Sequence, residues 1–180
     1  MTADELRQVL SDHAEWHRSN GSTGKRADLR SASLRGADLS GAILISANLI
    51  SASLRDANLS DANLSNAILS NAILRDANLS NAYLRGAILS GADLRGAILP
   101  NGKTLPDYIT WLPSGLLTQG GKPLADVVAA WDCHEWTGCP MHAAFGATGL
   151  GSVPDCWRAE AATFVALFDG RHVPRPEVTA

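Results

Sequence analysis

Residues 57–66 decide the fold, because they give one five-residue unit twice: Ala57-Asn58-Leu59-Ser60-Asp61 and then Ala62-Asn63-Leu64-Ser65-Asn66. The unit continues in both directions without a slip and fills residues 27–101. Leucine stands at every fifth position from Leu29 to Leu99, and alanine stands two residues before each leucine, fifteen times in all. An internal repeat with a period of five is therefore the main feature of this chain.

A period of five excludes both regular secondary structures. In a helix, at about 100° per residue, the leucines would be scattered around the axis. In a strand, an odd period would send successive leucines to opposite faces. The pattern instead predicts a coil that turns a corner every five residues, with leucine and alanine inside and Gly, Asn, Asp or Ser at the corners. Four such sides close a square, so the fifteen units make just under four coils.

The units also match a known family. Stretches such as Ala57-Asn58-Leu59-Ser60-Asp61 and Ala92-Asp93-Leu94-Arg95-Gly96 resemble the A(D/N)LXX consensus of pentapeptide repeat proteins. The resemblance covers residues 27–101 and implies a mainly β solenoid, the right-handed quadrilateral β-helix. The N-terminal stretch is similar to the short helix that often precedes such repeats. We therefore expect three parts: a capping helix and linker (1–26), the β-helix (27–101) and a small, mostly α C-terminal domain (102–180).

The flanking segments carry helix signals. Thr2 with Glu5 three residues later forms a capping box, and apolar residues at helical spacing predict an amphipathic helix over about 2–18, ended by Asn20-Gly21. We expect this helix to cover the open end of the first coil. After Pro100-Asn101-Gly102 the repeat stops, and helices are predicted near 123–131 and over 153–169, with Gly170 as the stop.

If four units make a coil, residues twenty apart stack in columns. One column is arginine throughout, beside two aspartates: Arg35, Arg55, Arg75, Arg95, with Asp56 and Asp76. Two interpretations are open, a solvated face of salt bridges or a stripe that binds an anion or an acidic partner. A second face is predicted to be apolar and partly exposed, and it would contact a partner or the flanking segments. Its candidate residues are Ile43, Ile45 and Ile50, with further isoleucines at 68, 73, 88 and 98.

The reactive side chains lie outside the repeat, since every His, Cys and Trp falls outside residues 27–101. Cys133, His134, Cys139 and His142 offer four zinc ligands, but their spacing matches no standard zinc knuckle. Cys139 with His142 is an alternative as a nucleophile and its base. The ordinary alternative is buried thiols and capping histidines. We expect no cofactor and no enzyme activity.

Charge and composition bound the function. The chain has a net charge of −3, and the repeat balances six Arg against six Asp. This balance argues against direct binding of nucleic acid. No apolar run is long enough for a membrane span, and the acidic residues Asp4 and Glu5 stand where a secretion signal would be basic. Three cysteines favour a reducing cytoplasm over a disulfide framework.

The resemblance adds an expected role. Family members that confer quinolone resistance look like duplex DNA and engage DNA gyrase, and other DNA mimics block CRISPR complexes. We therefore expect a protein–protein interaction protein, an inhibitor or regulator of a nucleic-acid-processing complex. A structural scaffold with the C-terminal domain as its binding module is one alternative, and a metal- or thiol-dependent activity at Cys133–His142 is another. Family members often pair through their C-terminal ends, so a homodimer is also considered.

Overall fold

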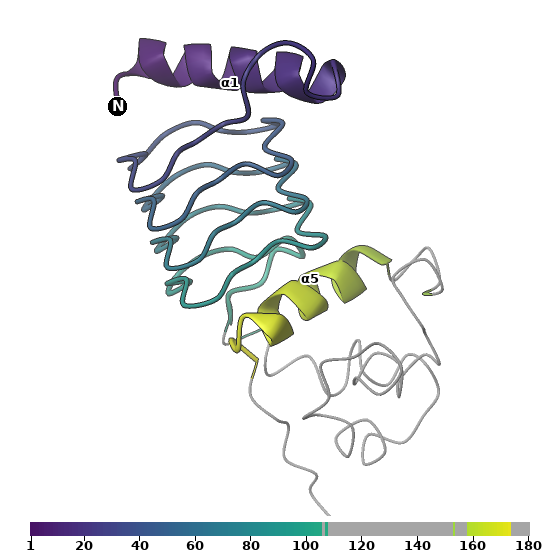
Figure 1. Ribbon diagram of the computed structural model, residues 1–180. Coiled ribbons are helices and arrows are strands. Elements are labelled where there is room, and N and C mark those ends of the chain that lie inside the picture. The colour runs from purple at the N-terminus through teal and green to yellow at the C-terminus, as the bar shows by residue number, and fades with distance from the viewer. Residues whose placement is uncertain (106, 108–152, 154–157, 174–180) are drawn as a thin grey trace, which may run out of the picture.

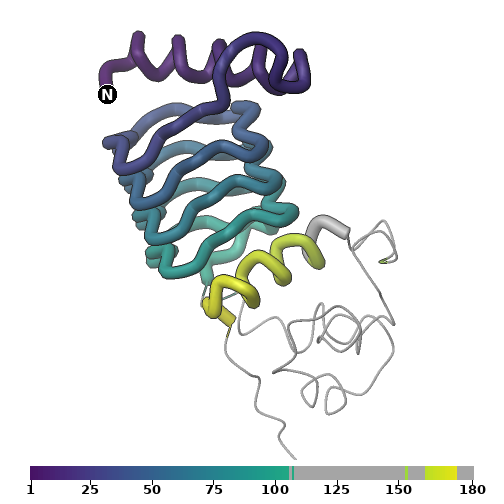
Figure 2. Tube along the Cα trace, viewed as in Figure 1, coloured from purple at the N-terminus to yellow at the C-terminus, as the bar shows by residue number. Residues whose placement is uncertain are grey.

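The computed structural model describes residues 1–105, 107, 153 and 158–173 (Figure 1). Along this part of the chain lie helix α1 (Ala3–Arg18), the repeat and helix α5 (Arg158–Asp169). Figure 2 shows α1 across one end of the coil and α5 at the other end. The helix expected near 123–131 and the cluster from Cys133 to His142 lie outside the described residues.

The repeat is a coil with four units per turn, as the pattern predicts. Eleven parallel β-bridges, from Asp28↔Asn48 to Asn78↔Ile98, each join residues twenty apart. Backbone hydrogen bonds tie the coils together along the axis: Leu49 N–H donates to the Ile68 carbonyl at 2.8 Å. Each side contributes a single bridge residue rather than a long strand, because a corner interrupts the extended backbone every five residues.

The corners have the geometry that the sequence predicts. At each one the alanine N–H donates to the carbonyl of the leucine three residues earlier, as Ala62 does to Leu59 at 3.1 Å. The residue before that alanine has a positive φ at fourteen successive corners, from Ser31 to Gly96. A positive φ at the third residue of a four-residue turn suits Gly, Asn and Asp, and these residues, with Ser, occupy the corners.

The interior of the coil is aliphatic. All fifteen leucines from Leu29 to Leu99 are buried, each with at most 3% of its surface exposed. The alanines from Ala47 to Ala97 are buried beside them, whereas three alanines of the first coil are only half-buried: Ala32, Ala37 and Ala42. The prediction of inward leucine and alanine is confirmed. Burial of these side chains is the main stabilising contribution available to the coil.

Helix α1 is closed at both ends by local hydrogen bonds. The Thr2 hydroxyl accepts from Glu5 N–H at 3.2 Å, and the Glu5 carboxylate accepts from Thr2 N–H at 2.7 Å, which completes the capping box. At the other end Gly21 N–H donates to the Trp16 carbonyl and Asn20 has φ 52°, a Schellman ending. Leu6, Val9 and Leu10 pack against the buried core.

The last coil ends in a reversal of the chain. Gly102 N–H donates to the Leu99 carbonyl, and Leu99 N–H donates to the Lys103 carbonyl. Thr104 forms an antiparallel bridge with Ile98. Helix α5 brings Phe164 and Phe168 together, with ring centroids 5.4 Å apart. Its end departs from the sequence expectation in detail: Gly170 is the capping residue, but the left-handed residue is the next one, Arg171, with φ 60°.

Candidate functional site

One side of the coil carries the predicted stack of arginines. The twenty-residue register places Arg35, Arg55, Arg75 and Arg95 in one line, which we call the arginine column. Asp56 and Asp76 stand at the adjoining corner. The Asp56 carboxylate bridges two rungs, with its Oδ2 3.3 Å from Arg35 Nε and 3.7 Å from Arg55 Nε. A nitrogen of Arg55 also lies 3.8 Å from Asp76 Oδ2. The aspartates therefore neutralise part of the column.

The C-terminal arginines of the column, Arg75 and Arg95, differ from Arg35 and Arg55 in their partners. Arg95 is held by a fork of two hydrogen bonds to Asp93, at 2.8 and 2.7 Å. These bonds lower the pKa of Asp93 to about 2, because they stabilise its charged form. Arg75 forms no ion pair with any described residue. The Nε atoms of Arg55 and Arg75 are shielded from water, and within the described part of the chain neither of them makes a hydrogen bond. Four arginines face three aspartates on this side, so it keeps an excess positive charge.

The isoleucines do not form the single face that we expected. Ile43 and Ile45 lie on one side of the coil, and Ile50 lies on the next side because it belongs to the following unit. The others, at 68, 73, 88 and 98, are spread over three sides for the same reason: consecutive units occupy consecutive sides. Ile43 is 41% exposed, whereas Ile45 and Ile50 are half-buried. The most exposed apolar side chain of the coil is Tyr83, at 60%.

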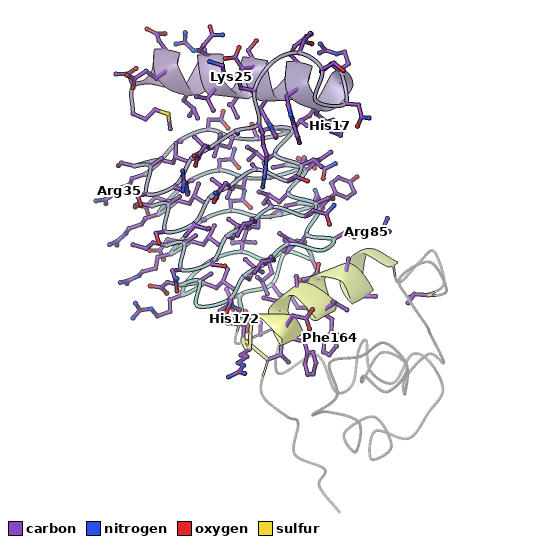
Figure 3. All side chains as sticks on the ribbon, viewed as in Figure 1. His17, Lys25, Arg35, Arg85, Phe164 and His172 are labelled. Carbon is purple, nitrogen blue, oxygen red and sulfur yellow. The ribbon has the colours of Figure 1, made fainter. Side chains whose placement is uncertain are left out.

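A groove of about 410 Å³ separates the N-terminal half of α1 from the first coil, and we call it the α1 groove. Its apolar lining comes from both elements: Met1, Leu6 and Leu10 on one wall, Leu34 and Ala37 on the other. Arg7 and Arg35 also line it, so the groove meets the first rung of the arginine column. Figure 3 shows Arg35 on the edge of the coil below the N-terminal end of α1. Nothing in the repeat pattern alone predicts this groove, because it depends on where α1 packs.

His13 joins α1 to the repeat. Its side chain is fully buried, its Nδ1 accepts a hydrogen bond from Ala27 N–H at 3.0 Å, and its ring stacks on Trp16 with centroids 5.5 Å apart. Burial lowers the pKa of His13, and the positive charges of His17 and Arg26 act in the same direction, while the Ile45 carbonyl opposes them. The helical spacing of His13 was the only sequence signal for this contact.

The other end of the coil is joined to α5 by His172, whose Nε2 lies 2.8 Å from the Leu89 carbonyl oxygen (Figure 3). Within the described residues no cluster of His, Cys, Asp or Glu is suited to hold a metal ion. None of the helices in that part of the chain is long and apolar enough to cross a membrane.

The comparison with protein families decides the identity of the repeat. A model described as pentapeptide repeats matches residues 25–61 and 62–101, in eight copies. The chain belongs to the pentapeptide repeat family. Membership implies the right-handed sense of the coil, and the four-unit register of the bridges agrees with a quadrilateral β-helix.

Several solved pentapeptide repeat proteins are similar to this one. Rfr23 from the cyanobacterium Cyanothece 51142 is 40% identical over 44% of this chain and 60% of its own, with a TM-score of 0.30. The protein alr5209 from Nostoc PCC 7120 is 33% identical over 51% of this chain and 75% of its own, with a TM-score of 0.27. QnrB1, described as a plasmid-mediated fluoroquinolone resistance protein, is 29% identical over 41% of each chain, with a TM-score of 0.22. The chain thus spans less than two thirds of Rfr23 and of QnrB1. A comparison with curated proteins found no match.

The charges of this pentapeptide repeat are largely paired on its own surface. Of its six aspartates, four lie against arginine: Asp28, Asp56, Asp76 and Asp93. Asp38 instead accepts hydrogen bonds from Ser40 and Asn58, which lower its pKa. Among the described residues, the pentapeptide repeat therefore has no strongly acidic side.

Proposed function

We propose that this pentapeptide repeat protein works without catalysis, by binding a protein partner through the sides of its coil. The arginine column carries this proposal, because it presents four guanidinium groups in one line on a hydrogen-bonded scaffold. Arginine forks suit carboxylates on a partner, and a fixed scaffold lowers the entropy lost on binding. The partner we favour is a nucleic-acid-processing enzyme, and DNA gyrase is the first to test.

Two observations bear on this choice of partner. QnrB1, a fluoroquinolone resistance protein, is similar to this chain over part of its length, which supports a topoisomerase as the target. The charge pairing argues for a different mode of contact from DNA mimicry, because a mimic of duplex DNA needs a strongly acidic surface. We therefore place the contact at the arginine column. A phage-defence complex such as a CRISPR effector is the second target to test.

The test is a gyrase supercoiling assay with the full chain at micromolar concentration, alone and with a fluoroquinolone. We expect the wild type to inhibit supercoiling or to protect gyrase from the drug, and the double variant Arg55→Glu/Arg75→Glu to lose this effect. Arg85→Glu is the matched control, because Arg85 has the same place in its unit but lies on the opposite side of the coil (Figure 3). A wild type with no effect on gyrase would exclude this target.

A second candidate function is a scaffold that carries a binding module in residues 102–180. The contact of His172 with Leu89 favours it, because the contact fixes α5 on the last coil. Affinity capture from the native host separates the candidates. A partner retained by Arg55→Glu/Arg75→Glu but lost on His172→Ala would support the scaffold, and sedimentation of the full chain would test for a homodimer.

A further inference from the structure

We propose that the α1 groove and the arginine column form one continuous track for an extended peptide segment of a partner protein. The segment would place an apolar side chain in the groove and carboxylates along the column. This inference rests on the proposed function, since it names the chemistry of the partner that the coil binds. Arg35 belongs to both parts, because it lines the groove and is the first rung of the column.

The groove suits a single apolar anchor. Its volume of about 410 Å³ lies at the lower end of the range for sites that enclose small ligands, and leucine and methionine side chains line it. Asp38 is the acidic residue of the lining, but its carboxylate is already engaged: Oδ1 accepts from Ser40 N–H at 3.1 Å, from the Ser40 hydroxyl at 2.7 Å and from Asn58 at 3.2 Å. The two arginines of the lining are also engaged, Arg7 with Asp4 and Arg35 with Asp56. The groove therefore contributes apolar contacts, and the arginine without an ion pair, Arg75, lies further along the column.

The column suits acidic side chains. Arg75 is the one arginine of the column without an ion pair among the described residues. A partner's carboxylate can accept two parallel hydrogen bonds from such a guanidinium group. Coils at β-sheet spacing place the rungs about 4.8 Å apart, so the four rungs span roughly 14 Å, the length of about four extended residues.

A peptide fits this track better than a nucleic acid. Asp56, Asp76 and Asp93 stand beside the arginines and repel any anionic chain, so charge alone does not favour a peptide over a nucleic acid. The groove distinguishes the two ligands. Its apolar side chains can bury a leucine side chain, whereas a sugar or a phosphate would gain nothing from them.

The test is binding of a fluorescein-labelled peptide, Leu-Glu-Glu-Glu-Glu-Glu, measured by fluorescence anisotropy with the full chain at low salt. We expect saturable binding that weakens as salt rises. Arg75→Gln should weaken binding about two- to fivefold, the range for an exposed ion pair. Arg85→Gln, on the opposite side, should leave binding unchanged. Arg75 is the best position for this test, because Asp56, Asp76 and Asp93 pair with other arginines and keep these partners when Arg75 is replaced.

The groove is tested by filling it. Ser33 lines the α1 groove, and Ser33→Trp should abolish the advantage of the leucine peptide over Gly-Glu-Glu-Glu-Glu-Glu. Ser53→Trp, one coil further from α1, is the control and should keep that advantage. Both variants should fold, because Tyr83 already occupies the same place in its own unit.

Three results would overturn the proposal. The first is no binding of the peptide at about 0.5 mM protein, a concentration that detects even a weak contact. The others are an equal loss of peptide affinity in Arg75→Gln and Arg85→Gln, and tighter binding of a duplex oligonucleotide or a lysine peptide. The proposed function fails separately. If affinity capture retains a protein partner that the acidic peptides do not displace, the coil binds proteins and only this track is wrong.

Discussion

The backbone N–H of Ala27, the first residue of the repeat, donates a hydrogen bond to the imidazole Nδ1 of His13 at 3.0 Å. This bond joins α1 to the coil in a place that water does not reach, since His13 is fully buried. The acceptor exists only while Nδ1 is unprotonated. The packing of α1 on the first coil is therefore linked to the protonation state of one histidine.

The first prediction is that the stability of the protein falls as pH falls below about 6.5. The pKa of His13 is lowered from 6.5 in the folded state, so between the two values the unfolded chain binds more protons than the folded one. Stability must then rise with pH in that window and level off above 6.5. Thermal unfolding followed by circular dichroism between pH 5 and 8 measures this dependence.

His13→Phe is the variant that isolates the group. It keeps a ring beside Trp16 but leaves Ala27 N–H without its acceptor, which should cost about 1–3 kcal/mol of unfolding free energy at pH 8. It should also flatten the dependence on pH. His17→Gln is the comparison, because His17 is exposed on the same helix: it should leave the stability at pH 8 unchanged and keep most of the pH dependence, since burial is the larger cause of the lowered His13 pKa. An unchanged pH dependence in His13→Phe would assign the effect to other groups.

The second prediction concerns two glycines of one corner column. Gly36 and Gly96 both have positive φ, near 70°, but a Cβ on Gly36 would meet no atom within 4 Å, whereas one on Gly96 would overlap Asp76 Oδ1. Gly36→Ala should therefore cost only the left-handed backbone, about 1 kcal/mol. Gly96→Ala should cost roughly 1 kcal/mol more, because Asp76 must rotate away from its place. Urea unfolding of both variants tests the difference, and equal losses would show that Asp76 yields freely.

The third prediction is an NMR titration of Asp93 with a midpoint near pH 2. The Arg95 guanidinium lowers the pKa of this carboxyl to about 2 by two hydrogen bonds, so the pair is complete above pH 4 and is lost as pH falls through 2. Arg95→Gln should return the midpoint toward 3.8, the ordinary value. Arg85→Gln should not move it. A midpoint near 4 in the wild type would mean that the fork is not formed in solution.

The sequence predicts the coil well because its rule is local and repeated. The period sets the number of units per turn, which places Arg35 above Arg55, and the inward leucines follow from the same count. The expectation of a single isoleucine face was wrong, because it did not take into account that consecutive units lie on different sides of the coil. The α1 groove and the His13 contact are tertiary features, which depend on how a helix with its own period packs against the coil.

The choice of ion pairs is also beyond the repeat pattern. Arg95 pairs with Asp93 of its own unit, whereas Arg35 reaches Asp56 in the next coil. The difference follows from which nearby position carries a carboxylate, since Ser33 stands where Asp93 stands three coils later. A periodic model treats these rungs as equal, although their neighbours make them chemically distinct.

The last prediction concerns Cys133, His134, Cys139 and His142, which the structure leaves undescribed. Their spacing, with no paired Cys-x-x-Cys element, matches no standard zinc site, so we expect the purified protein to contain far less than one equivalent of zinc. Elemental analysis measures the content directly. A structural zinc contributes to the folding free energy of the domain that it holds, so its removal would lower the melting temperature. Without such a zinc, a chelator such as EDTA should leave the melting temperature unchanged. Cys133→Ser/Cys139→Ser is the matched variant. Stoichiometric zinc that this variant loses, together with a lower melting temperature in EDTA, would contradict the prediction and assign the four residues to a metal site.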